Sequence, residues 1–207
     1  MRYWWWRLPV FLGAASVPLY WLYQAWAFAL GPDPGKVLVD RLGQGALVLL
    51  LLTLALTPLQ RASGWSGWAS IRRQLGLWTF AYASLHLGGY LFFILGLEVA
   101  RLPGEIIERP YILVGSLAFV GLLALALTSN RWSMRRLGKR WKQLHRLVYP
   151  VLLLALLHML WVVRSDAERW ALYAALAVIL LALRMPVVSG ALGRWRARKA
   201  VSEKTGI

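Results

Sequence analysis

Three histidines are the residues of this chain whose type and spacing could hold a cofactor. His86 lies in the middle of the apolar stretch LWTFAYASLHLGGYLFFILGL, residues 77–97, while His145 and His158 lie in a later apolar stretch. An imidazole at bilayer depth costs free energy, so a histidine in such a stretch usually has a partner or a function. The first question is therefore what these side chains bind.

The elements that must position the histidines are membrane-spanning helices. Hydrophobic residues make up 59% of the 207 positions, and the mean hydropathy is +0.56, which is too apolar for a soluble domain. A hydrocarbon core of about 30 Å requires roughly 20 helical residues. We predict spans near residues 8–30, 42–60, 75–97, 110–129, 143–163 and 169–188. The expected fold is an all-α integral membrane protein, with residues 1–207 forming one six-helix bundle.

Charge predicts the orientation of the bundle. With both termini cytoplasmic, the cytoplasmic side holds eighteen of the twenty-four Lys and Arg residues, and the opposite side holds seven of the eight acidic residues. Short basic loops face the cytoplasm in membrane proteins. The net charge of +16 therefore indicates topology and attraction to anionic membrane lipid, not nucleic acid. A second interpretation of the run RWSMRRLGKRWKQLHR is a docking surface for an acidic soluble partner.

His86 and His158 are predicted to lie at the same depth. His86 is 13 residues beyond Arg73 and His158 is 12 beyond Arg146, so each imidazole lies about 18–20 Å from the cytoplasmic boundary. Two neutral imidazoles facing each other from adjacent parallel helices can be the axial ligands of a b-type heme. A single membrane histidine is more often a packing residue or part of a proton path, but packing does not require equal depths. The chain has no cysteine, which excludes thiolate-held clusters and c-type heme attachment.

His145 is expected to serve a separate purpose. Thirteen residues turn an ideal helix by roughly 220° relative to its start, so His145 and His158 share a face only if Pro150 bends the helix. A second heme would need another histidine at the depth where Arg72 and Arg73 stand, so one heme is favoured. No nucleotide-binding domain is evident, so if electrons enter this protein, a separate molecule is expected to deliver them. Gly88 and Gly89 are expected to give the heme room.

The stretches RRQLGLWTFAYASLHLGGY (72–90) and LTSNRWSMRRLGKRWKQLHRLVYPVLLLALLHMLW (127–161) resemble the heme-binding membrane subunit of the periplasmic protein-methionine-sulfoxide reductase system. That family belongs to the ferric reductase and NADPH oxidase transmembrane superfamily. The resemblance implies a bacterial inner-membrane electron carrier with b-type heme and FMN. Its donor would be the quinone pool or a cytosolic flavin reductase. Its acceptor would be a periplasmic molybdopterin-containing subunit that reduces methionine sulfoxide in oxidised proteins.

The resemblance also implies roles for individual residues. His86 and His158 match the outer heme ligands, and His145 matches the histidine that helps to hold an inner heme in the oxidases. Where the oxidases have a second histidine in the third span, this chain has Arg72 and Arg73, which leaves His145 for a flavin or quinone near the cytoplasmic face. The candidate neighbours of a flavin phosphate are Arg72, Arg73, Arg135 and Arg136.

Other functions remain open at the level of sequence. One is a membrane reductase that acts directly on a small external acceptor such as a ferric chelate. Another is a non-redox, proton-coupled transporter, for which Glu98 is the acidic candidate, and a third is a structural scaffold. If a soluble partner docks, the outer loops near 103–110 and 165–168 are the expected surface, and their acidic residues are Glu105, Glu108, Asp166 and Glu168.

Overall fold

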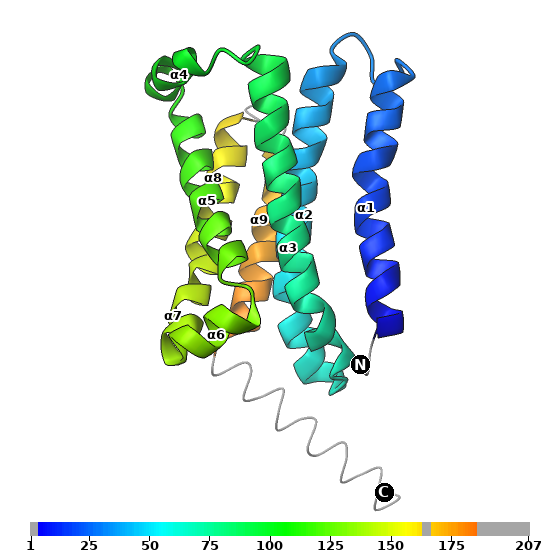
Figure 1. Cartoon of the computed structure of the whole chain (residues 1–207), viewed down its shortest axis with the longest axis vertical. Helices are drawn as coiled ribbons and strands as arrows, with labels where there is room; N and C mark the ends of the chain where they lie inside the picture. The colour runs from blue at the N-terminus through cyan, green and yellow to red at the C-terminus, as the bar shows by residue number, and fades with distance from the viewer. Residues whose placement is uncertain (1–3, 163–166, 186–207) are drawn as a thin grey trace, which may run out of the picture.

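The computed structural model describes residues 4–162 and 167–185, which form a bundle of long helices lying side by side (Figure 1). The long helices are α1 (Trp4–Trp26), α2 (Pro34–Ser63), α3 (Gly67–Gly89), α5 (Pro110–Leu127), α8 (Val148–Val162) and α9 (Ala167–Ala182). The short elements are a π-helical turn η1 (Tyr90–Ile94), a 3-10 turn η2 (Val99–Arg101), α4 (Leu102–Glu108), α6 (Arg131–Leu137), α7 (Lys139–Leu144) and a second 3-10 turn η3 (His145–Leu147).

Four segments are long and apolar enough to cross a membrane, namely Pro34–Ser63, Gly67–Ile94, Pro110–Leu127 and Lys139–Val162. They correspond to the second, third, fourth and fifth predicted spans. Helices α1 and α9 lie alongside them in the same bundle (Figure 1). The all-α, multi-pass membrane class is confirmed, while the count of six spans and the cytoplasmic placement of the termini stay predictions.

The two ends of the bundle differ in charge. At one end, which we call the basic end, lie the turn from α2 to α3 and the short helices α6 and α7 (Figure 1). At the other, the acidic end, lie the start of α2 and the short helix α4 (Figure 1). Helices α2, α5 and α9 run from the acidic to the basic end, whereas α1, α3 and α8 run the opposite way. Helices α3 and α8 are therefore parallel, as predicted.

Helix α2 begins earlier than predicted and ends sharply. Asp33 caps its first turn, accepting a hydrogen bond from the backbone N–H of Lys36 at 3.0 Å, and Pro34 occupies the first helical position, where a missing N–H has no cost. At the other end Gly64 adopts a φ of 71° and donates its N–H to the carbonyl of Gln60. These signals place the helix over residues 34–63, eight residues before the predicted start at residue 42.

The main apolar core lies where α2, α8 and α9 meet. Its most deeply buried side chain is Leu152, at 0% exposure, followed by Leu54, Val151 and Ala177, at 2% each. The closest helix pairs are α2 with α3 and α5 with α8. Glycines allow both approaches, because a Cβ at Gly45 would clash with the ring of Tyr82 and one at Gly121 would clash with Val151.

The fifth predicted span is interrupted just before Pro150. Helix α7 passes into the 3-10 turn η3 at His145, and α8 begins at Val148. A proline at position 150 has no N–H for the carbonyl of Arg146, four residues earlier, and Arg146 lies in the 3-10 turn. The expected irregularity is therefore present as a tightened turn on the N-terminal side of the proline.

Candidate functional site

His86 of α3 and His158 of α8 lie against each other inside the bundle. Their ring centres are 6.1 Å apart and their ring planes cross at 84°. The equal depth predicted from the sequence therefore corresponds to a direct pairing of the two imidazoles. Both side chains are partly buried.

Each imidazole is fixed by a hydrogen bond to the backbone of a neighbouring helix. His86 Nδ1 is 2.8 Å from the carbonyl oxygen of Val39 in α2, and His158 Nδ1 is 2.7 Å from the carbonyl oxygen of Tyr111 in α5. A carbonyl oxygen only accepts, so in both rings Nδ1 must carry the proton. In a neutral imidazole the lone pair then belongs to Nε2, which is the form that binds a metal.

Two glycines provide the space that these rings occupy. A Cβ at Gly43 would lie 2.9 Å from His86 Nδ1, and a Cβ at Gly115 would lie 2.8 Å from the ring of His158. Any larger residue at either position would push the imidazole away. Gly88 faces open space, while a Cβ at Gly89 would lie 3.0 Å from a methyl carbon of Val39. Close contact with the imidazoles is thus made by Gly43 and Gly115, two residues that sequence reasoning missed.

The two halves of the site repeat each other along the chain. In each half, the residue whose carbonyl accepts the hydrogen bond lies four residues before the glycine and 47 residues before the histidine. The first half is Val39, Gly43 and His86, and the second is Tyr111, Gly115 and His158, displaced by 72 positions. No repeat is evident in the amino-acid letters. The equal spacings become visible only once the contacts of the two histidines are known.

The geometry of the pair fits the two sides of one metal ion. With a metal–nitrogen bond of about 2 Å and a ring centre roughly 1 Å beyond the nitrogen, two opposed imidazoles have their centres about 6 Å apart. The observed separation is 6.1 Å. Among the described residues no group of three or more His, Cys, Asp or Glu side chains could hold a metal ion. Two imidazoles alone would leave the remaining ligands of such an ion to another group, as a heme macrocycle supplies them.

Asp40 adds a negative charge beside the pair. Its carboxylate interacts electrostatically with His86, and its position in α2 is one residue after Val39. Hydropathy predicts a span that begins at residue 42, which places Asp40 in the outer loop and gives no indication that it lies near His86. The early start of α2 is what brings this charge to the site.

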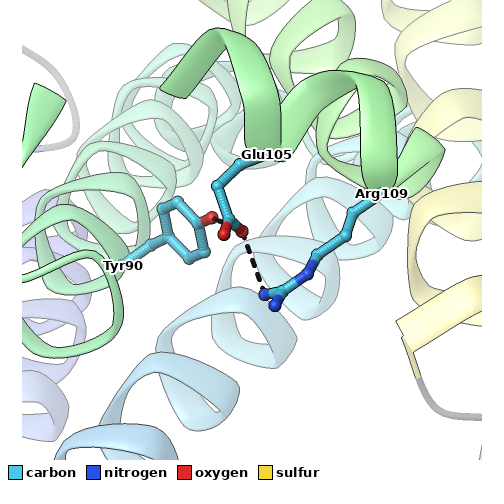
Figure 2. Close-up of polar contacts among 3 residues, drawn as sticks. All are labelled: Tyr90, Glu105 and Arg109. Carbon is cyan, nitrogen blue, oxygen red and sulfur yellow. Dashed lines mark hydrogen bonds and ion pairs between the residues drawn. The ribbon is translucent and has the colours of Figure 1, made fainter. Parts of the chain in front are cut away.

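A polar cluster lies toward the acidic end, one helical turn beyond His86. Figure 2 shows the carboxylate of Glu105, on α4, between the side chains of Tyr90 and Arg109. Tyr90 donates to Glu105 Oε2 at 3.3 Å, and Arg109 Nη1 lies 3.0 Å from the same oxygen. Electrostatic interactions with Tyr111 and Glu105 raise the pKa of Arg109, which keeps it charged. Glu105 is thus occupied within the protein, in contrast to the exposed Glu108.

His145 lies apart from the pair, near the basic end. Its ring stacks on Trp141 with centres 3.9 Å apart, and its Nδ1 is 3.2 Å from the carbonyl oxygen of Trp141. Its Nε2 lies 3.4 Å from the hydroxyl of Ser129, just after α5. The 3-10 turn η3 rotates the residues before it about the helix axis relative to those after it. As a result His158 contacts α5 at Tyr111, and His145 contacts Ser129, just after the end of α5. Arg73 stands 72 positions before His145, which is the distance that separates His86 from His158. The repeat therefore supplies no second imidazole to pair with His145.

The four arginines considered as phosphate neighbours do not come together. Arg72 points to α2, where its Nη2 donates to Gln60 at 2.9 Å. Arg73 and Arg135 are exposed, and the Arg136 guanidinium lies 5.1 Å from the centre of the Trp132 ring on the same short helix. Only Arg72 faces the interior of the bundle.

Two comparisons with known proteins agree with this arrangement. Residues 42–156 match the family model described as ferric reductase like transmembrane component, which covers more than half of the chain. A protein-methionine-sulfoxide reductase heme-binding subunit MsrQ from Xanthomonas campestris pv. campestris (strain B100) is 47% identical over 157 residues, which is 76% of this chain and 72% of the relative. The family match contains His86, Gly43, Tyr111 and Gly115, and it ends two residues before His158. The chain therefore belongs to the ferric reductase-like transmembrane family, as a membrane subunit of the MsrQ type.

Proposed function

We propose that His86 and His158 are the two axial ligands of one b-type heme and that the protein carries electrons through it across the membrane. The observation that supports this most directly is the 6.1 Å separation of two imidazoles whose Nδ1 atoms are both held by backbone carbonyls. When bound, the heme supplies an iron that alternates between the ferric and ferrous states. The name of the Xanthomonas relative, a heme-binding subunit, supports the same cofactor.

The residues around the ligands orient them and tune the iron. The hydrogen bonds from Nδ1 to Val39 and Tyr111 fix the tautomer and the ring orientation and make each Nε2 a stronger donor. Gly43 and Gly115 allow the rings to lie against the helices that hold them. Helix carbonyls cannot move without unwinding the helix, so the site is pre-organised before the cofactor enters.

The proposed direction of electron flow is from the basic to the acidic end. The donor would be the quinone pool or a cytosolic flavin reductase, with FMN near the basic end, as the sequence resemblance implies. His145 is the candidate neighbour of that flavin or of a quinone. The acceptor would be a periplasmic molybdopterin-containing methionine sulfoxide reductase, so the chain would support repair of oxidised proteins without itself catalysing the sulfoxide reduction.

The geometry disfavours a proton-coupled transporter. A relay needs imidazoles whose two nitrogens can exchange protons along a path of acidic or hydroxyl groups. Here each Nδ1–H donates a hydrogen bond to a helix carbonyl, which cannot take up the proton and pass it on. A reductase acting on a small external acceptor shares the same heme site, and the acceptor alone distinguishes it from the proposed function.

The proposal predicts a low-spin b-type spectrum, at one heme per chain, in the detergent-purified protein expressed with sufficient heme. Replacing either ligand, in His86→Ala or His158→Ala, should abolish the spectrum or make it high-spin, because one axial bond is lost. His145→Ala should keep it, because that ring packs on Trp141 away from the pair. The measurement is the reduced-minus-oxidised visible spectrum with heme quantified. A colourless wild-type protein would overturn the proposal.

Filling the space beside either ligating histidine should weaken heme binding, as removal of that histidine does. Gly43→Ala and Gly115→Ala each place a methyl group about 3 Å from an imidazole, so both variants should bind less heme or give a high-spin form. Alanine favours a helix over glycine by about 1 kcal/mol, so loss of helix cannot explain the defect. Gly88→Ala is the matched control, since it faces open space. Equal heme occupancy in all three variants would show that the glycines do not shape the site.

The carboxylate of Asp40 should hold the heme potential down. A negative charge near His86 stabilises the more positive ferric state, so Asp40→Asn should raise the reduction potential. An exposed charge pair contributes ~0.2–1 kcal/mol, and a tenfold change in equilibrium is about 59 mV for one electron, so we expect a rise of roughly 10–40 mV. Potentiometric titration measures it, with Glu108→Gln as a control. A fall in potential would contradict the assignment.

The proposed docking surface for the acceptor contains carboxylates in different surroundings. Glu105 is paired with Arg109, whereas Glu108 and Glu168 are exposed, and Asp166 lies outside the described residues. The double variant Glu108→Lys and Glu168→Lys should slow electron transfer to the purified acceptor severalfold at low salt and little at high salt. Arg140→Glu, at the basic end, is the control. An unchanged rate at low salt would exclude these carboxylates from docking.

A further inference from the structure

Two arginines meet at the basic end, inside the bundle, on one strip of α2. Arg72 of α3 donates from Nη2 to the side chain of Gln60 at 2.9 Å. Arg184, just after α9, donates from Nη2 to Thr57 Oγ1 at 2.9 Å and from Nη1 to the hydroxyl of Tyr149 at 3.1 Å. Thr57 and Gln60 are three residues apart on α2, so the two guanidinium groups bind adjacent turns of one helix.

A proline in α2 accounts for the inward position of the Arg184 side chain. Pro58 has no N–H for the carbonyl of Leu54, four residues before it in α2. Arg184 Nη2 donates to that carbonyl at 2.6 Å, which satisfies the free acceptor. This contact explains the position of the Arg184 side chain, but it uses only one nitrogen of the guanidinium group.

Each of the two guanidinium groups retains one buried donor without an acceptor. The Nε atoms of both Arg72 and Arg184 are buried and have no hydrogen-bond partner. Within residues 4–162 and 167–185, the ion pairs are Arg101 with Glu98 and Arg109 with Glu105, and both lie at the opposite end of the bundle. Two like charges and two buried N–H groups without acceptors are costly unless an anion joins them.

We propose that Arg72 and Arg184 form a binding site for one phosphate group at the membrane boundary of the basic end. Arg72 is five residues into α3, about 8 Å from the start of the helix, which is the depth of a headgroup. A guanidinium group offers a planar fork of donors that matches phosphate oxygens. The hydroxyls of Thr57 and Tyr149 are within reach of the same position because they already touch Arg184.

The phosphate could belong to a lipid, to a soluble phosphomonoester such as FMN, or to inorganic phosphate, and the chemistry of recognition is the same for all three. The site depends on Arg72 and Arg184, not on the histidine pair, so phosphate binding is tested independently of heme binding. It also differs from the exposed arginines of α6, which the sequence suggested as phosphate neighbours.

The test compares phosphate retention in the purified, full-length protein and in three variants. Arg72→Gln and Arg184→Lys remove one fork each, and Arg184→Lys keeps a positive charge near the carbonyl of Leu54. Arg73→Gln is the matched control, because it makes the same charge change at the adjacent, exposed residue. Native mass spectrometry measures retention of phosphatidylglycerol against phosphatidylcholine. Thermal unfolding, followed by tryptophan fluorescence, measures the effects of inorganic phosphate and of FMN at constant ionic strength.

We expect binding of at least one phosphate probe to weaken by roughly tenfold to a hundredfold in Arg72→Gln and Arg184→Lys and to be unchanged in Arg73→Gln. Preference for phosphatidylglycerol alone identifies a lipid as the source, whereas stabilisation by FMN or inorganic phosphate identifies a soluble one. Equal binding by all variants would overturn the site. Loss of heme from Arg72→Gln with phosphate binding unchanged would also overturn it, since the arginines would then serve a heme carboxylate.

Discussion

The hydrogen bond from an imidazole N–H to a helix carbonyl is the interaction on which this structure depends. It occurs twice, between α3 and α2 and between α8 and α5, and each time it joins the two helices that pack most closely. The carbonyl is part of a helix, so it cannot rotate toward another donor. One contact therefore fixes the tautomer, the direction of the ring and the register of the helix pair. The space left beside the ring is then too small for any residue but glycine at the facing position.

The distribution of charge gives the bundle its polarity. At the acidic end the positive groups of Arg101 and Arg109 are neutralised by neighbouring carboxylates. At the basic end Arg72 and Arg184 are satisfied only in part, by amide, hydroxyl and carbonyl oxygens. The two ends thus differ in chemistry as well as in sign. At the acidic end two arginines are paired with carboxylates, while at the basic end each of two arginines retains a buried Nε–H without an acceptor.

Sequence reasoning predicted the features that depend on depth and composition. Four of the six spans, the parallel course of α3 and α8, and the common depth of His86 and His158 follow from the rise of a helix and the cost of charge in lipid. It could not predict contacts that depend on rotation about the helix axes. Gly43, Gly115 and Arg184 were missed for this reason, and Asp40 was missed because a helix cap, which lies outside any hydropathy pattern, sets the start of α2.

The repeat of the two half-sites has a consequence for the stability of the assembled bundle. Each half is a pair of neighbouring helices that already holds its own histidine, and the two histidines are 72 positions apart along the chain. An ion bound to both would act as a cross-link that closes this long loop, and closing a long loop removes much of the freedom of the unassembled chain. A cofactor bound to both histidines would therefore stabilise the packing of the two halves against each other.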